Sequence, residues 1–356
     1  MKRGKNLYGL LLLAALVAGT LFYLLRRQPL SRLWAALSSL RPGYVLLGLG
    51  LMFCFVGCEA LCTRLILGRL GHRTPYHRCL GYSFTGFCVS SITPSSTGGQ
   101  PAQIYYMSRD GVPAAHGSLN MMLIAVCYQV VSFCYMVAAV FLLPQVRHGL
   151  GMGLGVLLLY GGLVTLVLTA GMLAMMFLPG LTRKLTSGVL TLGVKLRVIR
   201  REERVRESLA RQMEEYGRGA RCIRENLGLL PVLLGLTILQ LTALYAVPFV
   251  VYLGFGLRGM SLLQMAGAQA MIAMAVGLLP LPGAVGAAEG SALRVYTLFF
   301  GPALATPAVL AARVISFYSF LLISAVVALG VHFRTRGPAA LEELKKERLE
   351  LTEKAA

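Results

Sequence analysis

Three acidic side chains in apolar parts of this 356-residue sequence are the first candidates for chemistry. Eleven of the 14 Asp and Glu residues lie in two polar stretches, 202–225 and 342–353, which leaves Glu59, Asp110 and Glu289. An acidic residue inside a bilayer costs about 3 kcal/mol and is by default a sign of function. If these apolar parts cross a membrane, the isolated carboxylates are therefore candidate site residues.

Glu289 ends the glycine-bearing stretch Gly286–Glu289, which predicts the first turn of a helix. At bilayer depth it would bind a cationic group or carry a proton, or else form a structural ion pair with Arg294 or Arg313. Arg313 lies in a later apolar segment. Its planar, permanently charged guanidinium suits a phosphate group, and an ion pair with Glu289 is the competing interpretation.

A polar turn with two glycines is the next candidate, because exposed backbone N–H groups before a helix can hold an anion. The alternative is a plain turn that re-enters the membrane. The residues of this turn are Ser95, Ser96, Thr97, Gly98, Gly99 and Gln100. The aromatic pair Tyr105 and Tyr106 follows it, and these side chains are either ligands or aromatics at the membrane interface. We interpret Glu59 and Arg64 as structural, and the stripe Cys54, Cys58 and Cys62 as small packing residues rather than soft-metal ligands.

No Walker A loop, HExxH, GxSxG or EF-hand motif occurs in the sequence. We therefore predict no bound metal or cofactor, and no ATP hydrolysis. The net charge of +20 lies beside apolar segments, which favours anionic lipid over nucleic acid as its partner.

The composition predicts the elements that position these residues. Hydrophobic side chains make up 56% of the chain and charged ones only 13%, with a mean hydropathy of +0.70. A soluble domain carries about 25% charged residues. We therefore predict an all-α polytopic membrane protein with a transmembrane domain over 1–337, a cytoplasmic helical connector at 183–226 and a charged tail at 338–356. The six predicted full spans are Leu7–Leu25, Tyr44–Leu67, Asn120–Leu143, Leu150–Leu178, Leu227–Leu253 and Ala305–Phe333.

The positive-inside rule orders the remaining pieces. If both termini and the basic stretches 69–78 and 183–224 are cytoplasmic, then 79–107 starts and ends inside, whereas 262–302 starts and ends outside. Each is broken at Pro and Gly, at Pro94 to Gly98 and at Pro282, Gly283 and Gly286. Two opposed re-entrant hairpins of this kind predict an inverted repeat with a site at the midplane between them. Arg26 to Arg41 would lie outside, against this rule, and we assign those residues to lipid headgroups.

The stretches SSITPSSTGGQPAQIYYM and LPLPGAVGAAEGS resemble the membrane region of the lysylphosphatidylglycerol synthase/flippase family. The matching positions are Pro94, Gly98, Gly99, Tyr105 and Tyr106 in the first motif, Pro280, Pro282, Gly283, Gly286 and Glu289 in the second, and Arg313 in the last span. The resemblance covers about residues 7 to 333. Full-length members add a soluble domain that transfers an amino acid from aminoacyl-tRNA to phosphatidylglycerol, and only about 20 residues follow the last predicted span here.

The resemblance therefore implies the lipid-handling half of that activity. We expect a flippase-like translocator of an aminoacylated phosphatidylglycerol or another lipid phosphate in a bacterial plasma membrane, with membrane lipids and a separate synthase as partners. Resistance to cationic antimicrobial peptides is the expected role. The alternatives are a phosphatidylglycerol lysyltransferase, as the family name implies, and a small-solute secondary transporter.

Overall fold

The computed structural model describes residues 30–144, 151–177 and 214–335, apart from 215, 224, 227, 278 and 280, and all regular structure in these ranges is helical. The helices, in chain order, are α2 (Leu30–Ser38), α3 (Pro42–Arg69), α4 (Tyr76–Ile92), η1 (Pro94–Ser96), α5 (Gly99–Arg109), α6 (Ala114–Leu142), α8 (Gly151–Phe177), α11 (Leu229–Gly254), α12 (Leu262–Val276), η2 (Pro282–Ala284), α13 (Ala287–Arg313) and the π-helix η3 (Val314–Tyr318). Helical backbone continues from η3 to Thr335.

Five helical segments are long and apolar enough to cross a membrane. Helices α3, α6, α8 and α11 confirm four of the predicted spans, and the fifth segment, Ala287–Thr335, contains the predicted last span. Large apolar side chains on their outer faces are exposed, for example Leu159 and Phe141, each 76% accessible. Such faces are what lipid requires of a multi-pass membrane protein.

Three predicted elements fall wholly or largely outside the described residues: the first span Leu7–Leu25, most of the connector 183–226 and the tail 338–356. The predicted gap between two apolar pieces, residues 301–304, is shorter in the structure than we expected. We predicted a short apolar piece, Ala292–Phe300, separated from the span that begins at Ala305. In the structure a single residue, Gly301, has non-helical backbone (φ 74°, ψ 168°) between the two helical parts. Pro302 follows it and has no N–H to continue the helical ladder.

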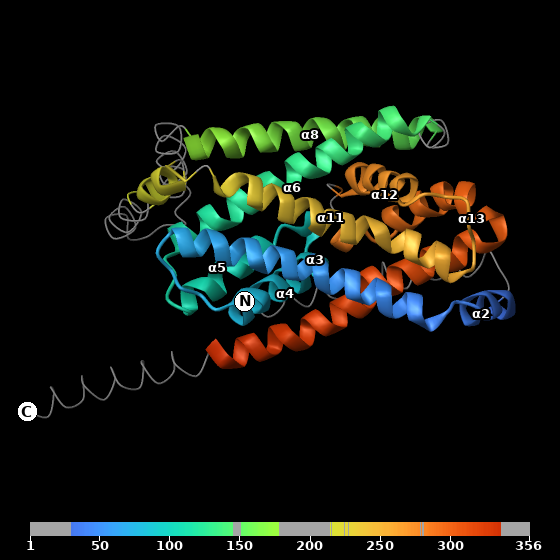
Figure 1. The fold of residues 1–356 in the computed structure, drawn as a ribbon, viewed down its shortest axis with the longest axis horizontal. Helices are drawn as coiled ribbons and strands as arrows, with labels where there is room; N and C mark the ends of the chain where they lie inside the picture. Colours follow the sequence, from blue (N-terminus) through green and yellow to red (C-terminus); the bar gives the residue numbers. More distant parts are fainter. Residues whose placement is uncertain are drawn as a thin grey trace, which may run out of the picture.

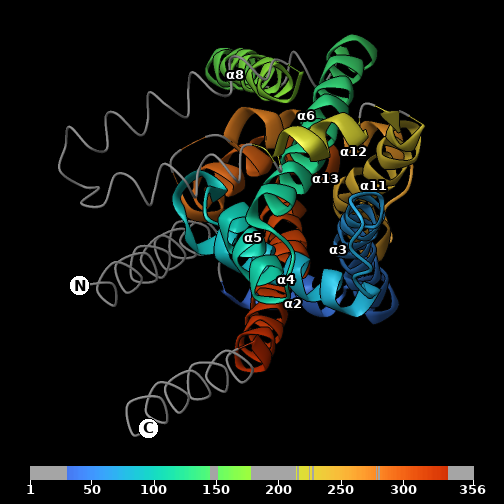
Figure 2. The same cartoon turned by 90° about the vertical axis from the view of Figure 1, so that its left-hand side faces the viewer.

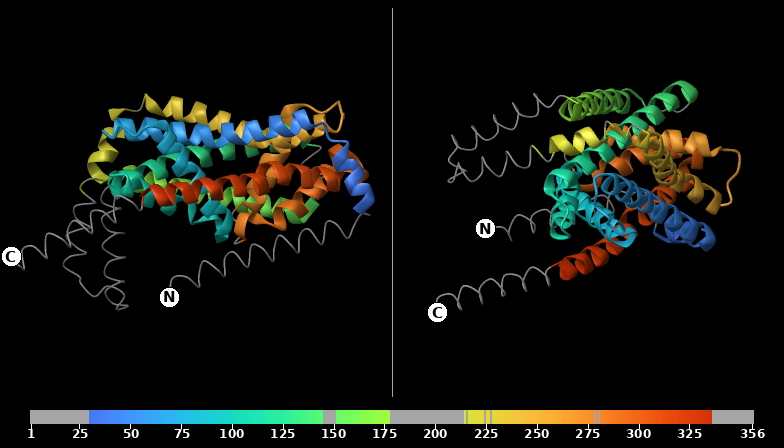
Figure 3. Two further views of the ribbon diagram at one scale, coloured as in Figure 1. Left: turned by 90° about the horizontal axis from the view of Figure 1, so that it is seen from below. Right: turned by 60° about the vertical axis from the view of Figure 1, so that its left-hand side comes forward.

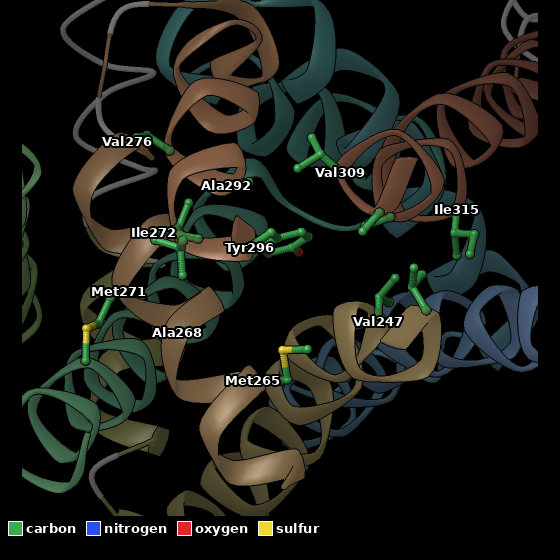
Figure 4. Close-up of a cluster of buried hydrophobic side chains, with 14 of the residues drawn as sticks. Val247, Met265, Ala268, Met271, Ile272, Val276, Ala292, Tyr296, Val309 and Ile315 are labelled. Atoms are coloured by element: carbon green, nitrogen blue, oxygen red, sulfur yellow. The ribbon is translucent and has the colours of Figure 1, made fainter. Parts of the chain in front are cut away.

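The long helices lie roughly side by side along the longest dimension of the molecule (Figure 1). Helix α3 packs against α11, and α8 packs against α6 and α12 at the outer edge (Figure 2). The short helices α4 and α5 lie toward one end of the bundle, whereas α12 and the first part of α13 lie toward the other (Figures 1 and 3). Helices α11, α12 and α13 pack against one another through apolar side chains, including Val247, Ile272, Tyr296 and Val309 (Figure 4).

The two breaks share several backbone features. Each begins with proline, Pro94 or Pro282, in a single 3₁₀ turn. In each, the residue after the turn donates its N–H to the proline carbonyl at 3.2 Å. Each turn also holds non-glycine residues at positive φ, Ser95 and Ser96 in one and Ala284 in the other. Such conformations cost about 1–3 kcal/mol each and persist where the surrounding structure imposes them, commonly at functional sites.

The two turns also touch one another. The Ser95 hydroxyl donates to the carbonyl of Leu279 at 3.4 Å, across 184 residues of sequence, and η1 lies against η2 while α4 packs on both turns. Two irregular backbone segments thus meet inside the helical bundle. Irregular backbone at membrane depth is tolerated where it is buried in protein or lines a cavity.

Candidate functional site

Glu289 and Arg313 form a buried ion pair. Gly286, at φ 89° in a conformation that side chains rarely adopt, turns the chain into α13 and places Glu289 at its third residue. The Glu289 Oε2 accepts the Gly286 N–H at 2.7 Å, while Oε1 accepts from Arg313 Nε at 2.6 Å. The Glu289 side chain is 1% exposed and that of Arg313 is 17% exposed. Each Glu289 oxygen therefore has a donor, and the carboxylate holds the arginine in place.

Arg313 has a second set of contacts that orient its guanidinium. The guanidinium carbon lies 4.3 Å from the centre of the Phe317 ring and 5.8 Å from that of Tyr318, within the range of a cation–π contact. Both rings belong to η3, a π-helical turn that begins directly after Arg313. A π-helical turn inside a helix is rare and is frequently found at functional sites.

Arg313 lines a cavity of about 530 Å³ that extends between the two breaks and the long helices. Helices α3, α4, α6, α11, α12 and α13 all contribute to its wall. Part of the wall is apolar, with Phe55, Phe87 and Ile272. Its polar side chains include Ser90, Ser95, Ser96, Gln100, Gln129, Gln269 and Ser316. This volume falls in the range of pockets that hold small molecules, about 300–1,000 Å³.

The residues of the predicted polar turn divide into two groups. Ser95, Ser96 and Gln100 line the cavity. Gly98 and Gly99 instead pack between α4 and α5: an added Cβ would lie 2.6 Å from Thr93 in the first case and 2.0 Å from Ser90 in the second. The exposed Thr97 hydroxyl donates to the Pro94 carbonyl. The backbone amides of Ser96, Thr97 and Gly98 donate within the turn.

The remaining predicted residues lie away from the cavity wall. Tyr105 is half exposed and packs edge-on against Tyr106, and the Tyr106 hydroxyl lies 3.0 Å from Nδ1 of His332. Arg294 is exposed, and its guanidinium lies against Gly151 rather than Glu289. Of the two arginines offered as partners of Glu289, the structure thus pairs it with Arg313.

Glu59 is the cavity residue whose position the sequence did not predict. It lines the same cavity from α3, and Gln103 of α5 donates its Nε2 to Glu59 Oε1 at 2.9 Å. The sequence offered two signals, a carboxylate within an apolar span and a glutamine one helical turn after Gln100. Nothing in the spacing indicated that a residue 44 positions away would reach it.

A comparison with known protein families shows which family this chain belongs to. Residues 7–324 match the family described as the lysylphosphatidylglycerol synthase TM region. The chain belongs to this family. The match spans both breaks and both members of the Glu289–Arg313 pair, and it confirms the resemblance carried by the two proline–glycine motifs. Comparison with proteins of curated function gave no significant match.

Proposed function

We propose that this membrane protein is a lipid translocator that moves the polar headgroup of a phospholipid through the cavity while the acyl chains remain in the bilayer. The observation that carries this proposal is Arg313, an arginine held inside a membrane protein at the wall of a cavity of about 530 Å³. An intramembrane charge at such a position marks a substrate path. Its guanidinium supplies donors that match phosphate oxygens.

The hydroxyl and amide side chains around Arg313 support the same substrate. Ser95 and Ser96 reach the cavity from the first break, and Ser316 reaches it from the π-helical turn. Hydroxyls donate and accept hydrogen bonds and suit a phosphodiester and its neighbouring glycerol oxygens. We assign Glu289 to positioning, because both of its oxygens are occupied within the protein.

The two breaks support an inverted-repeat mechanism. We infer that α4 with α5, and α12 with the first part of α13, are re-entrant hairpins that enter from opposite faces and meet at η1 and η2. Their similar turns and the Ser95–Leu279 contact support this arrangement. Rocking of one repeat against the other would open the midplane site alternately to each leaflet, as in transporters built this way.

We place the protein in a bacterial plasma membrane, with both termini in the cytoplasm, because the basic segments follow the positive-inside rule in that orientation. The substrate that fits the family is an aminoacylated phosphatidylglycerol or another lipid phosphate. A separate synthase would supply it, and export of a cationic lipid would support resistance to cationic antimicrobial peptides.

Lipid movement in proteoliposomes tests this function. The purified chain is reconstituted with fluorescent phospholipids, and lipid that reaches the outer leaflet is bleached with dithionite. We expect Arg313→Gln to reduce movement at least tenfold, as the loss of one charge-assisted hydrogen bond implies. Arg294→Gln removes an exposed arginine away from the cavity wall and should behave as the wild type.

Two further arms of the experiment separate the other activities open to this family. Transfer of radiolabelled lysine from charged tRNA to phosphatidylglycerol would identify a lysyltransferase. Uptake of soluble amino acids without lipid movement would identify a solute transporter. Either activity in a wild-type chain that moves no lipid overturns the proposal. Equal lipid movement by the wild type and a folded Arg313→Gln chain also overturns it.

A further inference from the structure

The cavity has a second charged group, and unlike Arg313 it has no partner of opposite charge among the described residues. Glu59 is half-buried on α3 and lines the cavity, where Gln103 donates to its Oε1. Among the residues that the structure describes, no Lys, Arg or His lies within 4 Å of this carboxylate. A negative charge in a membrane bundle without a positive partner is costly and calls for a compensating ligand.

The side chains around Glu59 carry unused hydrogen-bonding atoms. Ser83 and Gln240 face its carboxylate, and each side chain is at most 2% exposed. The Ser83 Oγ, the Gln103 Oε1 and the Gln240 Nε2 are buried without a hydrogen-bond partner among the described residues. The Ser83 Oγ and the Gln103 Oε1 can each accept a hydrogen bond, whereas the Gln240 Nε2 is a donor that lies toward the carboxylate. Buried polar atoms are nearly always paired, so two unpaired acceptors beside one carboxylate indicate a missing ligand that donates hydrogen bonds.

The chain makes room for this cluster through one glycine. A Cβ on Gly86 of α4 would lie 2.2 Å from Nε2 of Gln103 and 2.7 Å from its Cδ. The Gln103 side chain therefore crosses α4 where α4 has no side chain, and this crossing brings its amide to Glu59. Gly86, Ser83 and Gln103 all line the cavity, so the cluster opens onto the same space as Arg313.

We propose that Glu59, Gln103 and Ser83 form a subsite for a primary ammonium group, at a place in the cavity separate from the phosphate-binding Arg313. An ammonium group has three N–H donors and no acceptor. The cluster presents a carboxylate, the amide oxygen of Gln103 and the hydroxyl oxygen of Ser83, which are the acceptors that such a group needs. The inference rests on the proposed function, and what it adds is the assignment of amine recognition to Glu59 and its neighbours on the α3 side of the cavity.

This assignment differs from the one that the sequence favours. Glu289 is the carboxylate expected to face an amine, yet it is 1% exposed and is not part of the cavity wall. A proton is the other possible ligand of Glu59. The amide and hydroxyl oxygens around the carboxylate favour the ammonium group, because it supplies three donors for the carboxylate, the Gln103 Oε1 and the Ser83 Oγ, whereas a proton supplies one.

Binding of soluble headgroups to the purified full chain tests the subsite directly. The probes are glycerophosphoethanolamine and glycerophosphoglycerol, which share the phosphodiester and differ in the ammonium group, and the readout is saturation-transfer NMR with titration. We expect the wild type to favour the amine probe by about tenfold, the usual effect of a charge-assisted hydrogen bond. Glu59→Gln should abolish this preference and keep the binding of both probes, whereas Glu59→Asp should retain part of it.

Arg64→Gln is the matched control, since it removes an exposed charge from the same helix. Size-exclusion profiles identify any variant that fails to fold. Gly86→Ala, which displaces the Gln103 side chain from Cγ outward, then serves in place of Glu59→Gln. An unchanged amine preference in folded Glu59→Gln overturns the subsite. In proteoliposomes, an equal loss of transport for lipids with and without an amine, together with a loss of proton-gradient dependence, also overturns it, because that result identifies a proton carrier.

The two proposals fail in different ways. Lipid movement by the wild type without an amine preference leaves the translocator in place and removes the ammonium subsite. An amine preference that depends on Glu59, with no lipid movement in proteoliposomes, leaves the subsite in place and removes the translocator.

Discussion

Glu59 and Glu289 are both carboxylates within apolar helices, and their surroundings are opposite. Glu289 has two donors within the protein, the Arg313 guanidinium and the Gly286 amide, and is 1% exposed. Glu59 accepts from the Gln103 amide, has no cationic partner among the described residues and lines the cavity. A carboxylate whose charge is neutralised inside the protein stabilises structure, whereas one left facing a cavity among unpaired polar atoms is available to a ligand. Position along the chain does not distinguish these roles, but the partners do.

The largest effect is expected from breaking the Glu289–Arg313 pair. Arg313→Leu leaves the Glu289 carboxylate buried without its cation, which costs about 3–5 kcal/mol of stability. Thermal and denaturant unfolding of the detergent-solubilised chain measure this loss. The double variant Glu289→Leu/Arg313→Leu should recover much of the stability and none of the transport. A single variant as stable as the wild type would contradict the assignment of Glu289 to positioning.

Gly99→Ala should destabilise the region around Glu59, because it separates α4 from α5. Its new Cβ would lie 2.0 Å from the Ser90 hydroxyl and 2.7 Å from the carbonyl oxygen of Gly86. The second atom is backbone, so the helices must shift, at a cost of about 1–3 kcal/mol. Gly235→Ala on α11 has open space around it and is the matched control. We expect a lower unfolding temperature for Gly99→Ala alone, and equal temperatures would show that the α4–α5 contact is adaptable.

These two sites also show what the sequence can reveal. Apolar runs predicted the spans at α3, α6, α8 and α11, proline and glycine patterns predicted both breaks, and isolated charges singled out Glu289 and Arg313 as candidates, because each signal is local. The pairing of those two residues, 24 positions apart, depends on the bend at Gly301 and was one of two alternatives. The role of Glu59 depends on Gln103 crossing α4 at Gly86, a contact among three helices that no local pattern encodes.

Glu59→Gln should have a much smaller effect on stability than Arg313→Leu. The substitution leaves no cation without its partner among the described residues, and the glutamine oxygen can still accept from Gln103. We expect a change below about 1 kcal/mol, the net contribution of one hydrogen bond. The same unfolding assay measures it beside Glu289→Gln, which leaves the Arg313 charge unneutralised and should cost more. A larger loss in Glu59→Gln than in Glu289→Gln would reverse the roles that we assign to the two carboxylates.

Asp110, the third isolated carboxylate, should show the smallest effect. It caps α5 and accepts from Tyr82 at 2.5 Å and from Arg334 at 2.6 Å, while Arg78 lies 4.0 Å away. Arg334 is 38% exposed, so solvent and salt screen the pair. Arg334→Gln should therefore cost less than about 1 kcal/mol, and the loss should shrink in high salt. A double-mutant cycle with Asp110→Asn isolates the pair. We expect a smaller coupling energy than for Glu289 with Arg313. An equally large coupling energy that does not change with salt would contradict our explanation that burial makes the Glu289–Arg313 pair the stronger one.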